Sequence, residues 1–500
     1  PTPSWSYYFV CTGFSPVIDT AELFYRWDSI CPKCVLYYSA MNIETHLDYE
    51  TILANTHQPI HFAMKLRANA IDSKREQPLA FCVVLDRSGS MNGEPLKQAK
   101  DAASVAVRNL RTEDQFALIT FDNEAHTVFP LQSVSDKAAL IQKIGSIQPG
   151  GATNLTGGWM LGRDALKQGD VAITRRLLLL SDGCLNNGVT EPEMVSSIIC
   201  SGLEEDKIRT STLGFGDQYD EDLLSDLANK TNGQFYDANN ADKLPAIFDS
   251  ELDGLQKISA QNIRVRIKPL DFCDNLQALG TQPTVTLPDG RIEFALGDLV
   301  SEEEQVVCWS MDGLPIPLVD GKPVVSLEGE ELLDVEVLYD EICEDGIGSE
   351  TFHQVIRVKA TQDPAEVKPN GEVITWTSIQ QSGKTLAEAT QLMDKRDIDG
   401  ALDLLNSSIK RLQSLEGVEG LDDAIDPLLR LHATIERGLY NRGTRKRTVF
   451  ESREAYLMKS ASHWSSDAPI PKYKTSRRTI NDPEGDQQSS PSSKTKTDQQ

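Results

Sequence analysis

Residues 81–91 have the sequence Phe81-Cys82-Val83-Val84-Leu85-Asp86-Arg87-Ser88-Gly89-Ser90-Met91. An apolar run of this length that stops at an acidic residue predicts a buried strand followed by a loop. Apolar side chains then recur at helical spacing from Glu94 to Leu110, which predicts a helix. Because α/β sheets bind ligands outside the carboxyl ends of their parallel strands, the loop after Leu85 is a candidate site.

Alternating strands and helices are predicted from residue 79 to about residue 255. Further strands are expected at 116–121, 177–180, 208–215 and 234–236, with 125–129 returning beside 116–121. Further helices are expected at 136–147, 191–202, 220–230 and 241–255. This alternation indicates an α/β fold, a doubly wound and mostly parallel sheet covered on both faces.

Two more loops in this region carry oxygen donors. Gly150-Gly151-Ala152-Thr153-Asn154 opens a predicted helix, and Ser181-Asp182-Gly183 ends the strand at 177–180. Together with the first loop they offer two carboxylates, Asp86 and Asp182, and three hydroxyls, Ser88, Ser90 and Thr153. These are hard donors, which suit Mg²⁺, Mn²⁺ or Ca²⁺ rather than zinc or copper. A divalent cation site is therefore predicted.

These five residues resemble the metal-ion-dependent adhesion site of the von Willebrand factor type A (VWA) domain family. The family pattern is Asp-x-Ser-x-Ser on the first loop, Thr on the second and Asp on the third. The resemblance covers about residues 79–255 and implies a Rossmann-like sheet with one antiparallel edge strand. It also implies that Ser88, Ser90 and Thr153 are the direct ligands, that Asp86 and Asp182 act through water, and that an Asp or Glu of a protein partner takes an open position on the metal.

Each of these residues has a structural alternative. Asp86 and Asp182 could cap the helices that follow them, and Thr153 could cap its own helix. Three neighbours are expected outside the ligand set: Arg87 and Asn154 as surface residues that could tune partner choice, and Asp122 as a turn residue.

Residues 256–380 are predicted to form an antiparallel β-sandwich. Residues 263–267 and 333–337 alternate strictly between apolar and polar, and 288–290 supply a Pro-Asp-Gly turn. Strands predicted within 43–78 are expected to join this sandwich, which would make the VWA-like domain an insertion in it.

The stretch 291–300 resembles the sandwich that follows the VWA domain in one group of intracellular proteins. The group includes bacterial VWA proteins and plant VWA ubiquitin ligases, the Vwaint-type architecture. This sequence lacks the Cys/His ladder of the ligases' RING, so ligase activity is not predicted.

The remaining segments are less informative. Residues 381–460 are predicted to be helical and 461–500, which hold almost no aliphatic residues, to be a disordered tail. Residues 437–478 hold eleven Lys and Arg against three acidic residues; the alternatives are a solvated helix end and tail, or docking to an acidic surface. Residues 1–42 are unassigned. Cys11, Cys31, Cys34 and His46 are four possible zinc ligands, and the alternative is that this segment is loosely packed and binds no metal.

The whole chain has 500 residues and a net charge of −26, which argues against nucleic acid as a partner. No apolar run approaches the ~18 residues of a membrane span. The nine cysteines are odd in number and few for the length of the chain, which argues against a disulfide-rich secreted protein. Residues 1–20 lack the pattern of a signal peptide. A cytoplasmic location is therefore expected rather than secretion.

The leading hypothesis is a metal-dependent protein-binding module. A secreted or surface adhesion or channel-regulatory protein is one alternative, and a regulatory subunit that recruits an ATPase, kinase or ubiquitin-ligase partner is another. The sequence has no phosphate-binding Gly-x-x-x-x-Gly-Lys-Ser/Thr loop and no His-Glu-x-x-His motif, so an enzyme is not expected.

Overall fold

The protein is described here by a computed structural model that covers residues 41–458, except 71–77, 170–172, 217, 239–242, 283, 320–321, 324–328, 344–345 and 416. Cys11, Cys31 and Cys34 and the tail 461–500 lie outside the described residues, so the predictions for them stay untested. His46 lies on strand β1 (Met41–Leu47), where its ring centroid is 6.0 Å from that of Trp376. Within the part of the chain that the structure describes, no helix is long and apolar enough to cross a membrane.

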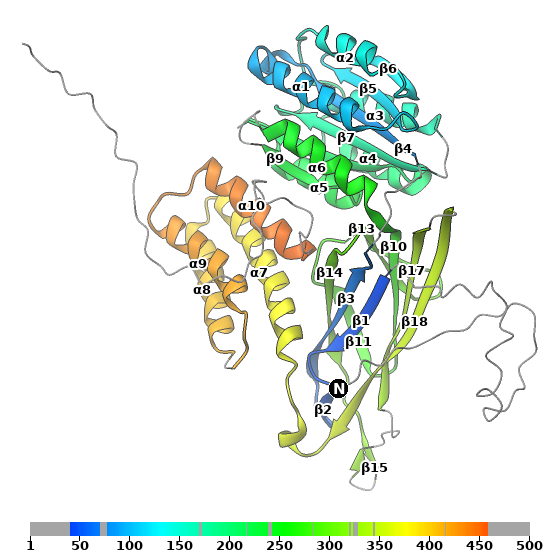
Figure 1. The fold of residues 1–500 in the computed structure, drawn as a ribbon. Helices are drawn as coiled ribbons and strands as arrows, with labels where there is room; N and C mark the ends of the chain where they lie inside the picture. Colours follow the sequence, from blue (N-terminus) through cyan, green and yellow to red (C-terminus); the bar gives the residue numbers. More distant parts are fainter. Residues whose placement is uncertain are drawn as a thin grey trace, which may run out of the picture. The chain divides into compact units, whose positions relative to one another are not determined.

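A six-stranded sheet forms the centre of the α/β domain (Figure 1). Its strands, in spatial order, are β6 (Ala125–Ser133), β5 (Gln115–Phe121), β4 (Leu79–Asp86), β7 (Thr174–Ser181), β8 (Arg209–Phe215) and β9 (Phe235–Ala238). All neighbours are parallel except β6, which runs antiparallel to β5 at one edge. The predicted Rossmann-like α/β class is confirmed.

Helices cover both faces of this sheet. Alternate residues of β4 face opposite ways, so Phe81, Val83 and Leu85 belong to one core and Ala80, Cys82 and Val84 to the other. The first core is completed by α1 (Glu94–Asn109), α2 (Lys137–Gly145) and α6 (Leu244–Gln256). The second is completed by α3 (Leu155–Lys167), α4 (Pro192–Asp206) and α5 (Glu221–Lys230). Burial on both faces explains the continuous apolar runs at 79–85 in β4 and 177–180 in β7.

The sandwich takes strands from both sides of the α/β domain in the sequence. One sheet has the order β1, β3 (Gln58–Ala68), β14 (Glu304–Gly313) and β11 (Cys273–Ala278). In it β3 pairs antiparallel with β14, and the opposed residues Phe62 and Trp309 stack with ring centroids 5.3 Å apart.

The second sheet of the sandwich has six strands and packs against the first through a shared apolar core. Its order is β12 (Thr284–Thr286), β13 (Ile292–Val300), β10 (Ile258–Pro269), β17 (Glu330–Cys343), β18 (Gly346–Thr361) and β2 (Thr51–Leu53). Its pairs are antiparallel except β18 with β2, which is parallel.

Four helices follow the sandwich: α7 (Gly371–Asp394), α8 (Ile398–Gln413), α9 (Asp422–Glu436) and α10 (Arg442–Leu457). The sandwich was expected to extend to residue 380, but α7 already begins at Gly371. The Asn370 side chain caps this start by accepting the Val373 N–H, and Val373 packs against the sandwich. The boundary between sandwich and helical segment therefore lies about ten residues earlier than predicted.

The structure also bears on the basic residues predicted at 437–478. Its described part is helical from Arg442 to Leu457, and Lys446 and Arg453 are buried. In this part Arg445 docks on the acidic Glu221 and Asp222, while residues 459–478 lie outside the described residues and the prediction for them stays untested.

Truncating Phe62 should destabilise the sandwich, because its ring is fully buried against Trp309. We expect Phe62→Ala to lower the free energy of unfolding by about 3–5 kcal/mol, measured by urea denaturation. Val285→Ala, a truncation of a side chain that is 57% exposed on β12, should change it by less than about 0.5 kcal/mol. Equal midpoints for the two variants would contradict this packing.

Candidate metal centre

Asp86 is the last residue of β4 and is fully buried. Its Oδ1 accepts the Ser88 N–H at 2.8 Å, and its Oδ2 accepts the Ser181 hydroxyl at 2.8 Å. Both partners are neutral. The carboxylate is therefore fixed in orientation without a compensating charge.

The two serines of the first loop link Asp86 to the strand beside it. Ser88 Oγ and Ser90 Oγ lie 3.1 Å apart, and Ser90 donates to Asp182 Oδ1 at 2.8 Å. Because β4 and β7 are parallel neighbours, with Leu85 opposite Leu180, their carboxyl ends meet at one edge of the sheet. Four of the five predicted residues are thus joined by hydrogen bonds.

Thr153 comes to the same edge from the loop before α3, and it is buried. A methyl group on Gly183 would lie 3.8 Å from both Thr153 Oγ1 and Ser90 Oγ, so these two hydroxyls face the same small space. The Thr153 N–H donates to Asn186 Oδ1 at 2.6 Å, which fixes the second loop against the third. All five predicted residues therefore converge.

The electrostatics of the edge are unfavourable without a cation. Burial raises the pKa of Asp86 from 3.8 to about 6, and burial also raises the pKa of Asp182. Neither carboxylate forms an ion pair with any Lys, Arg or His of the described chain. Two other buried acids of the α/β domain do: Asp114, at the opposite edge of the sheet, pairs with Arg111 at 3.0 Å, and Asp122 pairs with Arg87 at 2.9 Å.

Helix capping does not explain these residues. The side chain that caps α3 is Asn154, which accepts the Gly157 N–H, and not Thr153. The caps of α1 and α4 are Gly93 and Glu191. The alternatives that treated Asp86, Asp182 and Thr153 as helix caps are therefore excluded by the structure.

The three flanking residues have structural roles. Arg87 was expected to be a surface residue, but its guanidinium is half-buried and paired with Asp122. Asn154 was also expected to be a surface residue that could tune partner choice, and its side chain caps α3. Asp122 accepts the Glu124 N–H as expected of a turn residue. A Cβ on Gly150 would lie 1.9 Å from Asp122 Oδ2, so only glycine allows this close approach.

Three residues of the site were missed at the level of sequence. Ser181 had a usable signal, because the parallel pairing of β4 with β7 places it beside Asp86. Asn123 and Asn186 had none: Asn123 accepts the Ala152 N–H at 2.5 Å and Asn186 accepts the Thr153 N–H, and both are contacts between loops far apart in sequence.

The donor set fits a hard divalent cation. It offers two carboxylates and three hydroxyls, and two negative charges balance such an ion. Among residues 41–458 with the gaps given above, no group of three or more His, Cys, Asp or Glu side chains could hold a metal ion. A thiolate or imidazole centre of the zinc type is therefore absent from the described chain, and the hydroxyls of Ser88, Ser90 and Thr153 are needed at this site.

Part of the chain resembles a known family of protein domains. Residues 81–250 match the family of the von Willebrand factor type A domain. An uncharacterized protein of Synechocystis sp. is 26% identical over 359 residues, which cover 69% of this chain and 80% of that protein. An uncharacterized protein of Escherichia coli is 27% identical over 210 residues, which cover 41% of this chain and 36% of that protein.

Two solved structures resemble most of the chain. A von Willebrand factor type A protein from Catenulispora acidiphila has a TM-score of 0.67 at 16% identity and covers 83% of this chain and 97% of its own. The ArnB paralog VWA2 from Sulfolobus acidocaldarius has a TM-score of 0.57 at 15% identity and covers 84% of this chain and 98% of its own. At such identities the likeness shows the fold alone.

The pH dependence of stability in chelator should report the burial of Asp86. Below pH ~4 its carboxyl is protonated in both the folded and the unfolded chain, and burial of charge costs nothing. Between pH ~4 and ~6 the folded state keeps a proton that the unfolded state loses, so the free energy of unfolding falls as the pH rises. Asp86→Asn removes this cost and should raise the free energy of unfolding by about 1–3 kcal/mol at pH ~7.5, with no gain at pH ~4.

Asp101→Asn is the matched control, because Asp101 is an exposed carboxyl on α1. It should leave the pH dependence unchanged. A loss of stability on Asp86→Asn in chelator at pH ~7.5 would contradict the uncompensated charge.

Proposed function

Because residues 81–250 form a von Willebrand factor type A domain, we propose that this chain is a metal-dependent protein-binding module. In this proposal Asp86, Ser88, Ser90, Thr153 and Asp182 hold a divalent cation at the edge of the sheet. The bound cation captures the carboxylate of an Asp or Glu on a protein partner.

The observation that carries the proposal is the pair of buried carboxylates without a counter-ion. Buried charges in proteins are paired or coordinate metals, because an isolated one is costly. Here the neighbours of Asp86 and Asp182 are hydroxyls and N–H groups, which orient the oxygens but do not neutralise them. A divalent cation supplies the missing charge.

The donor types favour Mg²⁺, with Mn²⁺ and Ca²⁺ as alternatives. Mg²⁺ prefers six oxygen ligands and keeps waters readily, so a set in which the carboxylates act through water suits it. Two carboxylates offset the charge of the ion without excess, which leaves it attractive to one more anionic oxygen. A protein side chain of Asp or Glu provides that oxygen.

The exposure of the edge supports a macromolecular partner. Ser90, Gly151 and Asn186 are exposed around the buried ligands, so a side chain from outside has access. A net charge of −26 disfavours nucleic acid. The proposal assigns no catalytic step to the chain. It places the protein in the cytoplasm, consistent with the free thiols of Cys82, Cys184, Cys200, Cys273 and Cys308.

Direct titration tests the cation. Isothermal titration should find one Mg²⁺ site per chain that Thr153→Val weakens by tenfold or more, since the change removes a donor oxygen and keeps the side-chain shape. The Asp101→Asn control should bind like the wild type. Unaltered Mg²⁺ affinity in Thr153→Val would exclude this ligand set.

Selection from random displayed peptides tests the partner class. In Mg²⁺ the wild-type chain should enrich peptides with an Asp or Glu, and excess chelator or Asp86→Ala should abolish the enrichment. Binding of the same peptides in chelator would refute the role of the metal in capture.

A further inference from the structure

Helix α10 presents a row of basic residues to the α/β domain. Arg453 is buried and donates to Asn229 Oδ1 at 2.8 Å and to the Gly233 carbonyl at 3.3 Å. Three other basic residues lie two to three turns earlier on the helix: Arg442, Arg445 and Lys446. They contact α5 and the loop between β8 and α5, here called the β8–α5 loop.

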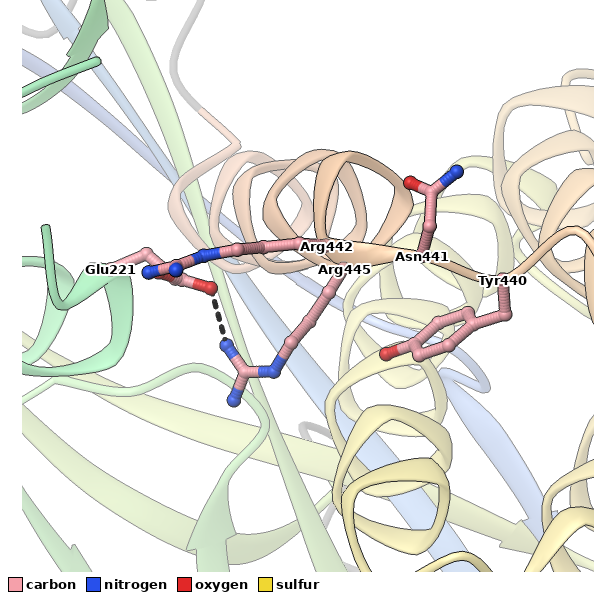
Figure 2. Close-up of a pocket in the computed structure, with 5 residues that line it drawn as sticks. All are labelled: Glu221, Tyr440, Asn441, Arg442 and Arg445. Atoms are coloured by element: carbon pink, nitrogen blue, oxygen red, sulfur yellow. Dashed lines mark hydrogen bonds and ion pairs between the residues drawn. The ribbon is translucent and has the colours of Figure 1, made fainter. Parts of the chain in front are cut away.

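Arg445 of α10 bonds acidic residues of two other helices, α5 and α7. Its guanidinium bonds Glu221 Oε1 at 2.7 Å, as Figure 2 shows, and it also contacts Asp222, the next residue of α5. On its other side it bonds Asp394 Oδ2, at the end of α7, at 2.8 Å. Glu221 is buried, so this ion pair is shielded from solvent. Arg445 therefore joins the helical segment to the α/β domain.

Arg442 and Lys446 hold the β8–α5 loop itself. Arg442 extends beside Arg445 (Figure 2) and donates to the Tyr219 carbonyl at 3.2 Å and to Gln218 Oε1 at 3.2 Å. Lys446 donates to the Gly216 carbonyl at 2.8 Å, and its Nζ lies 3.8 Å from the centroid of the Tyr219 ring. Two backbone carbonyls and one side chain of the loop are thus bound by one helix.

The β8–α5 loop also contacts the loop that carries Asp182. Strands β7 and β8 are parallel, with Ser181 opposite Gly214, so both loops leave the sheet at the same edge. The Cys184 thiol donates to the Gln218 carbonyl at 3.1 Å. Cys184 is two residues after Asp182. A continuous set of contacts therefore leads from α10 to the candidate metal centre.

We propose that docking of α10 and cation binding at the sheet edge are coupled, so that each stabilises the other. The inference rests on the proposed function, because it concerns the same cation. With α10 docked, the β8–α5 loop is held and the Asp182 loop is held against it, so the ligands are already ordered when the cation binds. With α10 released, ordering these loops costs part of the binding free energy.

Coupling of this kind is reciprocal. A cation bound at the edge should make the contacts of α10 harder to break, and the partner that binds the cation should add to this effect. Cation binding would then stabilise the docking of the helical segment although that segment does not contact the cation site. Only part of the α10 contacts reach the β8–α5 loop, so we expect a change in affinity of about threefold to tenfold.

The test compares two substitutions of the same kind on one helix. Arg442→Gln removes the bonds to Gln218 and Tyr219, and because Arg442 is exposed the variant should fold. Arg447→Gln removes the same charge from an exposed position of α10. Titration with Mn²⁺, followed by electron paramagnetic resonance of the free ion, should give threefold to tenfold weaker binding for Arg442→Gln and wild-type binding for Arg447→Gln.

A second measurement follows hydrogen exchange, first in the unmodified chain and then in a variant of the loop contact. Mn²⁺ at saturation should slow hydrogen exchange of the α10 amides in the wild type, and this slowing should be reduced in Cys184→Ala, which breaks the contact between the two loops.

The outcomes separate the two claims. Absence of Mn²⁺ binding by the wild type would overturn the proposed function, and the coupling with it. Binding by the wild type that is equal in Arg442→Gln and Arg447→Gln, with no slowing of exchange in α10, would overturn the coupling and leave the proposed function standing.

Discussion

The Asp86 carboxylate lies at the end of a strand that is buried on both faces, and its hydrogen-bond partners are an N–H and a hydroxyl. Its placement depends on the rest of the α/β domain. Burial of β4 requires helices on both faces of the sheet, and the parallel pairing with β7 sets Asp182 beside it. The loops must then approach closely enough for Ser90 and Thr153 to reach the same space. The two carboxylates, Asp86 and Asp182, that the fold does not neutralise are the basis of the cation affinity proposed for this edge.

The same principle separates this edge from the other buried charges. Arg445 with Glu221 and Arg209 with Asp298 place opposite charges in contact, so those pairs join elements without needing a ligand. Asp86 and Asp182 have like charge and lie near each other, and the Asp182 charge adds to the rise in the pKa of Asp86. An ion pair links parts of the fold, whereas two uncompensated carboxylates offer a binding site.

Much of the α/β domain could be predicted from the sequence because its signals are local. Apolar runs such as 81–85 and 177–180 indicate buried strands, and a polar residue at the end of each marks the edge where ligands bind. The proximity of the Asp86 and Asp182 loops follows from the parallel pairing of β4 with β7, whereas Thr153 reaches the same edge on the loop before α3.

The sequence was a poorer guide wherever tertiary contacts decide the structure. Residues 371–379 are rich in β-branched side chains, yet they are helical because Val373 packs against the sandwich. Arg87 and Asn154 were expected to be surface residues. In the structure Arg87 forms a salt bridge with Asp122, and Asn154 caps α3. The docking of α10 depends on Glu221 and Asp222, more than 200 positions away from Arg445 in sequence. No local pattern encodes such a contact.

Anomalous X-ray scattering from a crystal grown with Mn²⁺ tests the central claim most directly. The account predicts one strong peak at the carboxyl end of β4, with the hydroxyl oxygens of Ser88, Ser90 and Thr153 and the carboxylates of Asp86 and Asp182 around it. An Mn²⁺ peak elsewhere in the chain, with this edge empty at saturating ion, would contradict it.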